Sequence, residues 1–307
     1  DTRRLHKRAG LCSGKSVMQV EKNPLSAKVT QIVERATRRL VVSAVTLAGG
    51  RTDAKLVVLS DGSQVVVKLP KGNGDKLAIE GSSIEYLKKH TSLPMPEVFY
   101  SDDSVLVHEY IVADGTLAAD SEPETAELLA KLHEQTASQY GFDFDTLYRG
   151  AIQPNKKNGK WTDFFAQNRL LFMARQALDT GYLTSETMGR IEKLAGQLHR
   201  WLDEPERPSL IHGDIWSSSV LCRHGRVKAF VDPAICFADS EFEFAFCGVQ
   251  GLSKRFYAVY NEIRPFRASF FEVRQMIYNL YPLLSDIRLN SADAHRRIDA
   301  ILKRFGV

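Results

Sequence analysis

The sequence predicts an α+β protein with two lobes, an N-terminal lobe built on an antiparallel sheet and a larger, mainly helical C-terminal lobe. The chain has 307 residues, enough for two domains at roughly 150 residues each. Before Asp114-Gly115, β-branched segments alternate with turn residues, whereas after it apolar residues recur mostly at helical spacing. We therefore expect lobes over residues 26–113 and 114–307, preceded by a disordered basic tail over residues 1–25.

Composition and charge exclude several classes of protein. Hydrophobic residues make up 44% of the chain and charged residues 25%, which is typical of a globular protein. The net charge of the chain is +4, which equals the surplus of basic over acidic residues in the tail. The rest of the chain is therefore near neutral, unlike a dedicated nucleic-acid binder. No apolar run approaches the roughly 18 residues of a membrane span. Four widely spaced cysteines favour reduced thiols in a cytoplasmic protein over zinc or disulfides, and the oligomeric state stays open.

The first lobe is expected to contain a helix, a series of strands and a second helix. The two helices are predicted at residues 26–40 and 76–89, and the strands at residues 41–47, 55–59, 65–69 and 105–111. Asp61-Gly62 is typical of a hairpin turn, which predicts antiparallel pairing of the strands on either side.

The second lobe is predicted to be helical around one island of strands. Ser121 and Glu124 have the spacing of a capping box, so a helix is expected from there to about Ala137. Further helices are predicted at residues 161–179, 185–202, 241–260, 267–285 and 291–304. The strands of the island are predicted at residues 209–211, 220–223 and 226–231.

Two charged residues of the first lobe lie where apolar residues are expected. Lys68 ends an apolar strand, and Glu80 shares the apolar face of the following helix with Leu77, Ile84 and Leu87. A buried carboxylate is costly unless it is paired with a cation, and Lys68 is the nearest candidate upstream. The alternative is that Glu80 sits at the edge of this face and reaches water.

Two acids in the strand island follow the order of a kinase active site. Asp214 lies in a loop after a strand, and Asp232 ends a short apolar strand on the far side of a hairpin. In kinases the first acid accepts the proton of the substrate hydroxyl, and the second holds Mg²⁺ on the phosphates. The Gly49-Gly50 turn between two strands and Lys68 on the next strand complete the same order.

Several motifs of the chain resemble those of the fructosamine kinase (ketosamine 3-kinase) family. His212-Gly213-Asp214-Ile215-Trp216-Ser217 is similar to the family's HGDLWSGN signature, and Asp232-Pro233-Ala234 is similar to its DPA motif. The resemblance covers residues 29–305. It implies a bilobal protein-kinase-like fold, related to that of aminoglycoside phosphotransferases. It also implies ATP- and Mg²⁺-dependent phosphorylation of a sugar hydroxyl on a fructosamine- or ribulosamine-type substrate, free or protein-bound, in deglycation repair or metabolism.

The resemblance also implies a role for each matching residue. Asp214 would be the general base and Asp232 the magnesium ligand, while Lys68 would hold the ATP phosphates with Glu80 orienting it. Gly49 and Gly50 would belong to a loop over the phosphates, and Glu109, Tyr110 and Ile111 would form the hinge that meets adenine. The ring of Trp216 would face the sugar, and His212 would brace the catalytic loop. Core packing is the alternative role for Trp216.

One position departs from the family pattern and supports a second hypothesis. Ser219 stands where the family has the asparagine that is the second metal ligand of kinases. A serine hydroxyl can bind Mg²⁺, but it is shorter and less basic than an amide oxygen. The chain could therefore be a non-catalytic nucleotide-binding protein on the same fold. A third hypothesis is a kinase of the aminoglycoside or choline type, against which Trp216 argues by resemblance.

Overall fold

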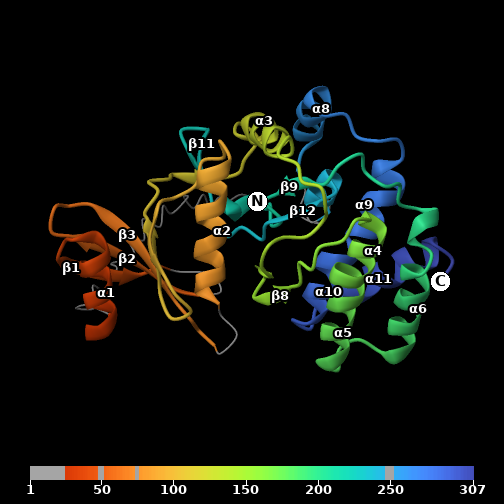
Figure 1. The fold of residues 1–307 in the computed structure, drawn as a ribbon, viewed down its shortest axis with the longest axis horizontal. Helices are drawn as coiled ribbons and strands as arrows, with labels where there is room; N and C mark the ends of the chain where they lie inside the picture. Colours follow the sequence, from red (N-terminus) through yellow and green to blue (C-terminus); the bar gives the residue numbers. More distant parts are fainter. Residues whose placement is uncertain (1–24, 48–51, 73–75, 246–251) are drawn as a thin grey trace, which may run out of the picture.

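The computed structural model describes residues 25–47, 52–72, 76–245 and 252–307. A twisted sheet with a helix on each side forms one end of the molecule, and most of the helices form the other (Figure 1). Helix α2 stands between the sheet and the helical part, as Figure 1 shows. The sequence-based expectation of a sheet-rich part followed by a larger helical part agrees with this arrangement.

The N-terminal sheet has five antiparallel strands in the order β1-β2-β3-β5-β4. Its strands are β1 Val41–Thr46, β2 Asp53–Leu59, β3 Gln64–Leu69, β4 Val98–Ser101 and β5 Leu106–Glu109. The predicted turn at Asp61-Gly62 joins β2 to β3, and Gly62 has φ +82°, a conformation that glycine adopts at no steric cost. Strand β4 was not predicted, because its four residues carry too short a pattern to be distinguished from a loop.

The two faces of this sheet pack against different helices. On one face, Val65, Val67 and Val107 join a core with Val29 and Val33 of α1 (Ala27–Thr37). On the other face, Leu106 joins Leu77, Ile84 and Leu87 of α2 (Leu77–His90) in the main core. Because successive side chains of a strand alternate between faces, Lys68 and its neighbours two residues away lie on the α2 side.

The C-terminal part is mainly helical, as predicted. Its α-helices are α3 Glu122–Leu132, α4 Trp161–Phe165, α5 Phe172–Asp179, α6 Ser185–Ala195, α8 Lys254–Ile263, α9 Gln275–Tyr278, α10 Leu280–Ile287 and α11 Ala292–Arg304. A π-helical stretch, Ala166–Leu171, joins α4 to α5, so the helix predicted at residues 161–179 is continuous. Among the described residues, no helix has both the length and the apolar character needed to cross a membrane.

Two sequence-based details of these helices are wrong. Ser121 has helical backbone angles, and its hydroxyl bonds to the backbone of Ala118 instead of capping α3. The carboxylate of Glu124 accepts a hydrogen bond from the Val227 nitrogen at 2.9 Å, so a tertiary contact replaces the expected capping box. The helix then ends at Leu132, five residues before the expected Ala137.

Within the described residues, the helix predicted at residues 241–260 is not continuous. Ser240–Phe244 forms a 3₁₀ turn, and α8 begins only at Lys254. The helix predicted at residues 267–285 is likewise divided, into a π-helical stretch Phe270–Arg274 followed by α9 and α10. Apolar spacing alone did not reveal these interruptions, because both segments bury aromatic side chains on several sides.

The strand island consists of two small sheets, and α3 packs against a strand of each. Strands β10 (Val220–Arg223) and β11 (Arg226–Phe230) form the predicted hairpin, and the short β6 (Gly115–Thr116) pairs with β10. Strand β9 (Ser209–Ile211) pairs with β12 (Cys236–Ala238), which was not predicted. A further hairpin joins β7 (Thr146–Tyr148) to β8 (Ala151–Gln153).

Candidate active site

Lys68 joins the two parts of the molecule through a pair of ion pairs. Its Nζ lies 2.5 Å from Oε1 of Glu80 and 2.5 Å from Oδ1 of Asp232, which is 164 residues away along the chain. The side chains of Lys68 and Glu80 are 13% and 14% exposed, whereas that of Asp232 is 48% exposed. The pairing expected for Glu80 is therefore present, and Asp232 presents its carboxylate at the open side of the cluster.

The three charges of this cluster shift one another's pKa. Burial lowers the pKa of Lys68, but the carboxylates of Asp232 and Glu80 outweigh burial and hold it above its usual value. Burial raises the pKa of Glu80, and the Lys68 ammonium opposes this shift only in part. For Asp232, burial is outweighed by Lys68, and its pKa is lowered. The charged ammonium of Lys68 can attract a phosphate, and the ionised carboxylate of Asp232 can attract a cation.

The loops that carry Asp214 and Asp232 are joined backbone to backbone. Strand pairing between β9 and β12 extends into a hydrogen bond from the Ala234 nitrogen to the His212 oxygen at 2.8 Å. Gly213 has φ +86°, and a Cβ atom built there would lie 2.1 Å from the Ala234 oxygen. Only glycine permits this approach, so the contact with the Ala234 backbone requires a glycine at the motif position next to Asp214.

A buried carboxylate holds the loop before Asp214. Glu243 accepts hydrogen bonds from the backbone nitrogens of His212 and Gly213 at 2.6 and 2.8 Å. Its Oε2 also lies 3.4 Å from Nε2 of His133, whose Nδ1 lies 2.7 Å from the Tyr260 hydroxyl. A carboxylate only accepts, so His133 carries its proton on Nε2 and accepts from Tyr260. No sequence pattern had indicated a role for Glu243 or His133.

The residues around Asp214 have different degrees of exposure. Asp214 is 8% exposed, and its backbone nitrogen donates to Nδ1 of His212 at 3.4 Å. His212 is fully buried, and burial lowers its pKa, so the ring is neutral near pH 7. Trp216 is only partly buried.

Ser219 is buried in a 3₁₀ turn after Trp216. Its hydroxyl accepts a hydrogen bond from the Trp216 nitrogen and donates one to the Trp216 oxygen, both at 2.9 Å. The residue has no exposed surface. The hydroxyl expected to bind a metal thus closes a local turn in this structure, and ligation by Ser219 stays a prediction.

The predicted hinge leaves strand β5 toward the C-terminal part. Glu109 ends β5, and both its backbone nitrogen and its side chain bond to Glu97 rather than to the Lys68 cluster. Tyr110 and Ile111 follow and are partly exposed. The two glycines predicted to cover the phosphates, Gly49 and Gly50, lie outside the described residues, as do residues 1–24 of the predicted tail.

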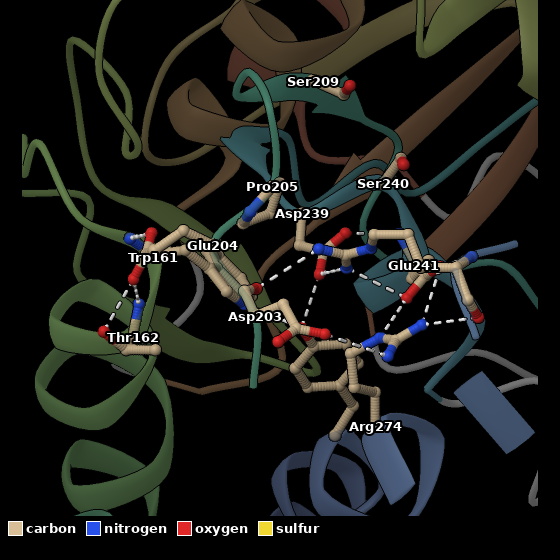
Figure 2. A network of polar contacts seen from close by, with 12 residues as sticks. Trp161, Thr162, Asp203, Glu204, Pro205, Ser209, Asp239, Ser240, Glu241 and Arg274 are labelled. Carbon is tan, nitrogen blue, oxygen red and sulfur yellow. Dashed lines mark hydrogen bonds and ion pairs between the residues drawn. The ribbon is translucent and has the colours of Figure 1, made fainter. Parts of the chain in front are cut away.

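A second polar network anchors the segment that follows Asp232 (Figure 2). Glu241 accepts hydrogen bonds from Arg274 Nε at 2.6 Å and from Arg267 Nη2 at 2.9 Å. Arg267 also pairs with Asp239, which accepts from the Tyr278 hydroxyl at 2.5 Å. Both acids and Arg274 are buried, so the network ties β12 and the 3₁₀ turn to α9.

Comparison with known proteins identifies the family. A family model described as fructosamine kinase matches residues 25–305 of the chain. The chain belongs to the fructosamine kinase family. Among its relatives, the protein named probable ketoamine kinase YniA of Escherichia coli K12 is 30% identical over 218 residues, 68% of this chain and 73% of that protein.

Solved structures agree with this family and with the fold class. A structure from Thermobifida fusca, described as a putative fructosamine-3-kinase, superposes with a TM-score of 0.80 at 25% identity, covering 91% of this chain and 98% of that chain. Aminoglycoside phosphotransferase APH(4)-Ia, solved with AMP-PNP and hygromycin B, superposes with a TM-score of 0.64 at 18% identity over 91% of this chain and 99% of that one. The predicted bilobal, protein-kinase-like α+β fold is confirmed, and the family makes the chain a kinase of the ketoamine type.

Proposed function

We propose that this fructosamine kinase family member transfers the γ-phosphoryl group of ATP to a sugar hydroxyl of a ketosamine, at the 3-position of a fructosamine or ribulosamine. The observation that carries the proposal is the contact of Lys68 with both Glu80 and Asp232 at 2.5 Å. This triad assembles a phosphate-binding cation and a cation-binding acid from two parts of the chain. The AMP-PNP bound in the structurally similar phosphotransferase supports ATP as the donor.

In the proposed reaction, the chain's residues orient the phosphate and remove one proton. The substrate hydroxyl oxygen forms a bond to the γ-phosphorus while the bond from that phosphorus to the β–γ bridging oxygen breaks, and ADP leaves. Asp214 accepts the hydroxyl proton, Lys68 holds the α- and β-phosphates, and Glu80 keeps the ammonium in place. His212, fully buried against the Asp214 nitrogen, braces the catalytic loop.

The Asp232 carboxylate is well suited to bind a magnesium ion, and the Ser219 hydroxyl is less well suited. The Asp232 carboxylate is 48% exposed, and oxygen ligands are the ones that Mg²⁺ prefers. In the described part of the chain, no three His, Cys, Asp or Glu side chains form a ready-made metal cluster, so ATP phosphates would supply further ligands. When bound, the ion would neutralise charge on the phosphates. Ser219 could ligate it only by giving up its two bonds to Trp216.

The remaining roles complete the proposal. The backbone of Glu109, Tyr110 and Ile111 would meet adenine, and Gly49 and Gly50 would cover the phosphates. Trp216, which is only partly buried, would offer its ring to the sugar. A lobe boundary near Ala113 would place ATP between residues 26–113 and 114–307. The proposed biological role is repair or metabolism of ketosamines, free or protein-bound, in the cytoplasm.

The test is phosphoryl transfer from ATP to fructoselysine and ribuloselysine, followed by mass spectrometry of the product and by ADP release. With Mg²⁺ present, we expect a phosphorylated product whose formation falls by roughly 10²- to 10⁴-fold in Asp214→Asn. Asp179→Asn is the matched control, because Asp179 is exposed at the end of α5. Absence of product with Mg²⁺ and with Mn²⁺, on free ketosamines and on a glycated protein, would reject the proposal.

The buried hydroxyl of Ser219 favours one other function, nucleotide binding without catalysis. Stabilisation of the protein by ATP without any turnover, unchanged in Ser219→Asn, would support it. Turnover by the purified wild-type protein would eliminate it, whatever the behaviour of the variant.

A further inference from the structure

His108 is buried immediately before the proposed hinge and faces the ion-pair cluster. It is the penultimate residue of β5 and is 5% exposed. In the sheet, His108 pairs with Val66, and Leu106 pairs with Lys68. Cross-strand partners share a face, as do residues two apart on one strand. His108 therefore lies on the same face as Lys68, toward α2 and Asp232.

One hydrogen bond decides which ring nitrogen of His108 carries the proton. Nδ1 lies 2.9 Å from the backbone oxygen of Glu109, which can only accept. Nδ1 is thus the donor, and Nε2 of the neutral ring is an acceptor. Burial, with a further contribution from the Lys68 ammonium, lowers the pKa of His108 to about 4, so the ring is neutral near pH 7.

Nε2 of His108 is buried without a hydrogen-bond partner among the residues that the structure describes. A buried acceptor left unpaired is unfavourable, and such atoms in native proteins usually meet a ligand or water. Lys68, the donor two strand positions away, is already engaged by two carboxylates. A bound group that donates a hydrogen bond would satisfy this buried acceptor.

We propose that Nε2 of His108 accepts a hydrogen bond from the exocyclic amine of the purine base and so makes the site select 6-amino over 6-oxo purines. This inference rests on the proposed function, in which the base lies against residues 109–111. A 6-amino group donates to the lone pair, whereas the carbonyl oxygen of a 6-oxo purine would face it as a second acceptor. His108 is thus a specificity-determining residue for the nucleotide.

The experiment measures dissociation constants of the full-length protein for ATP and for purine riboside triphosphate, which differ only in the 6-amino group. Wild type, His108→Met and the control His199→Met are compared, since His199 is exposed in a 3₁₀ turn outside this sheet. We expect wild type and His199→Met to prefer ATP, and His108→Met to lose about fivefold or more of that preference, the size of one hydrogen bond. Inosine triphosphate should bind wild type more weakly still, and should gain relative to ATP in His108→Met.

The result that would overturn this role of His108 depends on whether the His108→Met variant folds. An ATP preference that changes by less than twofold in a folded His108→Met variant overturns the inference, because a water or packing then satisfies Nε2. If His108→Met does not fold, equal wild-type affinities for ATP, purine riboside triphosphate and inosine triphosphate overturn it instead. Turnover of ATP with no base preference would sink this inference alone, whereas failure of wild type to bind any triphosphate would sink the proposed function as well.

Discussion

Oε1 of Glu243 lies 2.8 Å from the backbone nitrogen of Gly213, one residue before Asp214. The second oxygen of the same carboxylate accepts from the His212 nitrogen, so one side chain fixes two successive peptide groups of the loop. Glu243 is 3% exposed and comes from the 3₁₀ turn after β12. The position of Asp214 therefore depends on a buried residue 29 positions later in the chain.

Replacement of Glu243 by glutamine should misplace Asp214 while leaving nucleotide binding intact. The amide keeps one acceptor but turns an NH₂ donor toward a backbone N–H, so one charge-assisted bond becomes a repulsive contact. We expect kcat to fall at least tenfold with little change in the KM for ATP, and stability to fall by about 1–3 kcal/mol. Glu192→Gln, at an exposed position of α6, is the control. An unchanged kcat in a folded Glu243→Gln protein would contradict this role.

Gly213→Ala should be among the most damaging single-methyl additions in the chain. The added Cβ would lie 2.1 Å from the Ala234 oxygen at a φ of +86°, so backbone must move. We expect a loss of about 3 kcal/mol or more in urea unfolding. Gly189→Ala is the control, because nothing lies within 4 Å of its Cβ in α6 and alanine favours helices there by about 0.5–1 kcal/mol. Equal stability of the two variants would refute the close approach.

Arg274→Met tests the network shown in Figure 2. Arg274 is 1% exposed, pairs with Glu241 at 2.6 Å and donates to the Ala268 oxygen at 2.7 Å. Removing the guanidinium leaves buried acceptors unsatisfied, so we expect a loss of about 3 kcal/mol in chemical denaturation. Arg296→Met, which removes an exposed pair with Asp293, should change stability by less than about 1 kcal/mol. A similarly small effect at Arg274 would show that Arg267 alone holds the acids.

Acid should destabilise the protein partly through its buried histidines. The pKa of His133 and of His212 is lowered by burial, and that of His108 falls to about 4. Because the unfolded chain then binds more protons, this stability is complete above about pH 6.5 and is lost as the pH falls toward the folded value. For His108 the loss between pH 7.5 and pH 5 should be about 2 kcal/mol.

Chemical denaturation of wild type, His108→Met and His199→Met at these two pH values isolates the contribution of His108 to the acid-induced loss of stability. His108→Met should lose about 2 kcal/mol less than wild type on acidification. His199→Met should behave as wild type, because His199 is exposed. Equal losses of stability on acidification in all three proteins would mean that His108 takes up a proton in the folded protein as readily as in the unfolded chain.

The site residues that could be predicted from the sequence are those marked by a local sequence pattern. Glu80 was recognisable because a carboxylate stood on the apolar face of a helix, and its partner Lys68 ended the preceding strand; the ion pair is present at 2.5 Å. Glu243 and His108 gave no such signal. Each is a polar residue inside an apolar segment. Only the fold shows that Glu243 accepts from two backbone nitrogens and that Nε2 of His108 has no hydrogen-bond partner among the described residues.

Local patterns in the sequence were enough to predict the α+β order, the antiparallel first sheet, the α2 face that carries Glu80 and the family of the chain. These follow from periodicity, turn residues and motifs, which are local along the chain. Only the tertiary structure decided that Lys68 reaches Asp232 across 164 residues, that Gly213 lies against Ala234, and that the Ser219 hydroxyl closes a turn. Contacts between distant segments depend on how strands pair and how loops pack, and no local pattern records them.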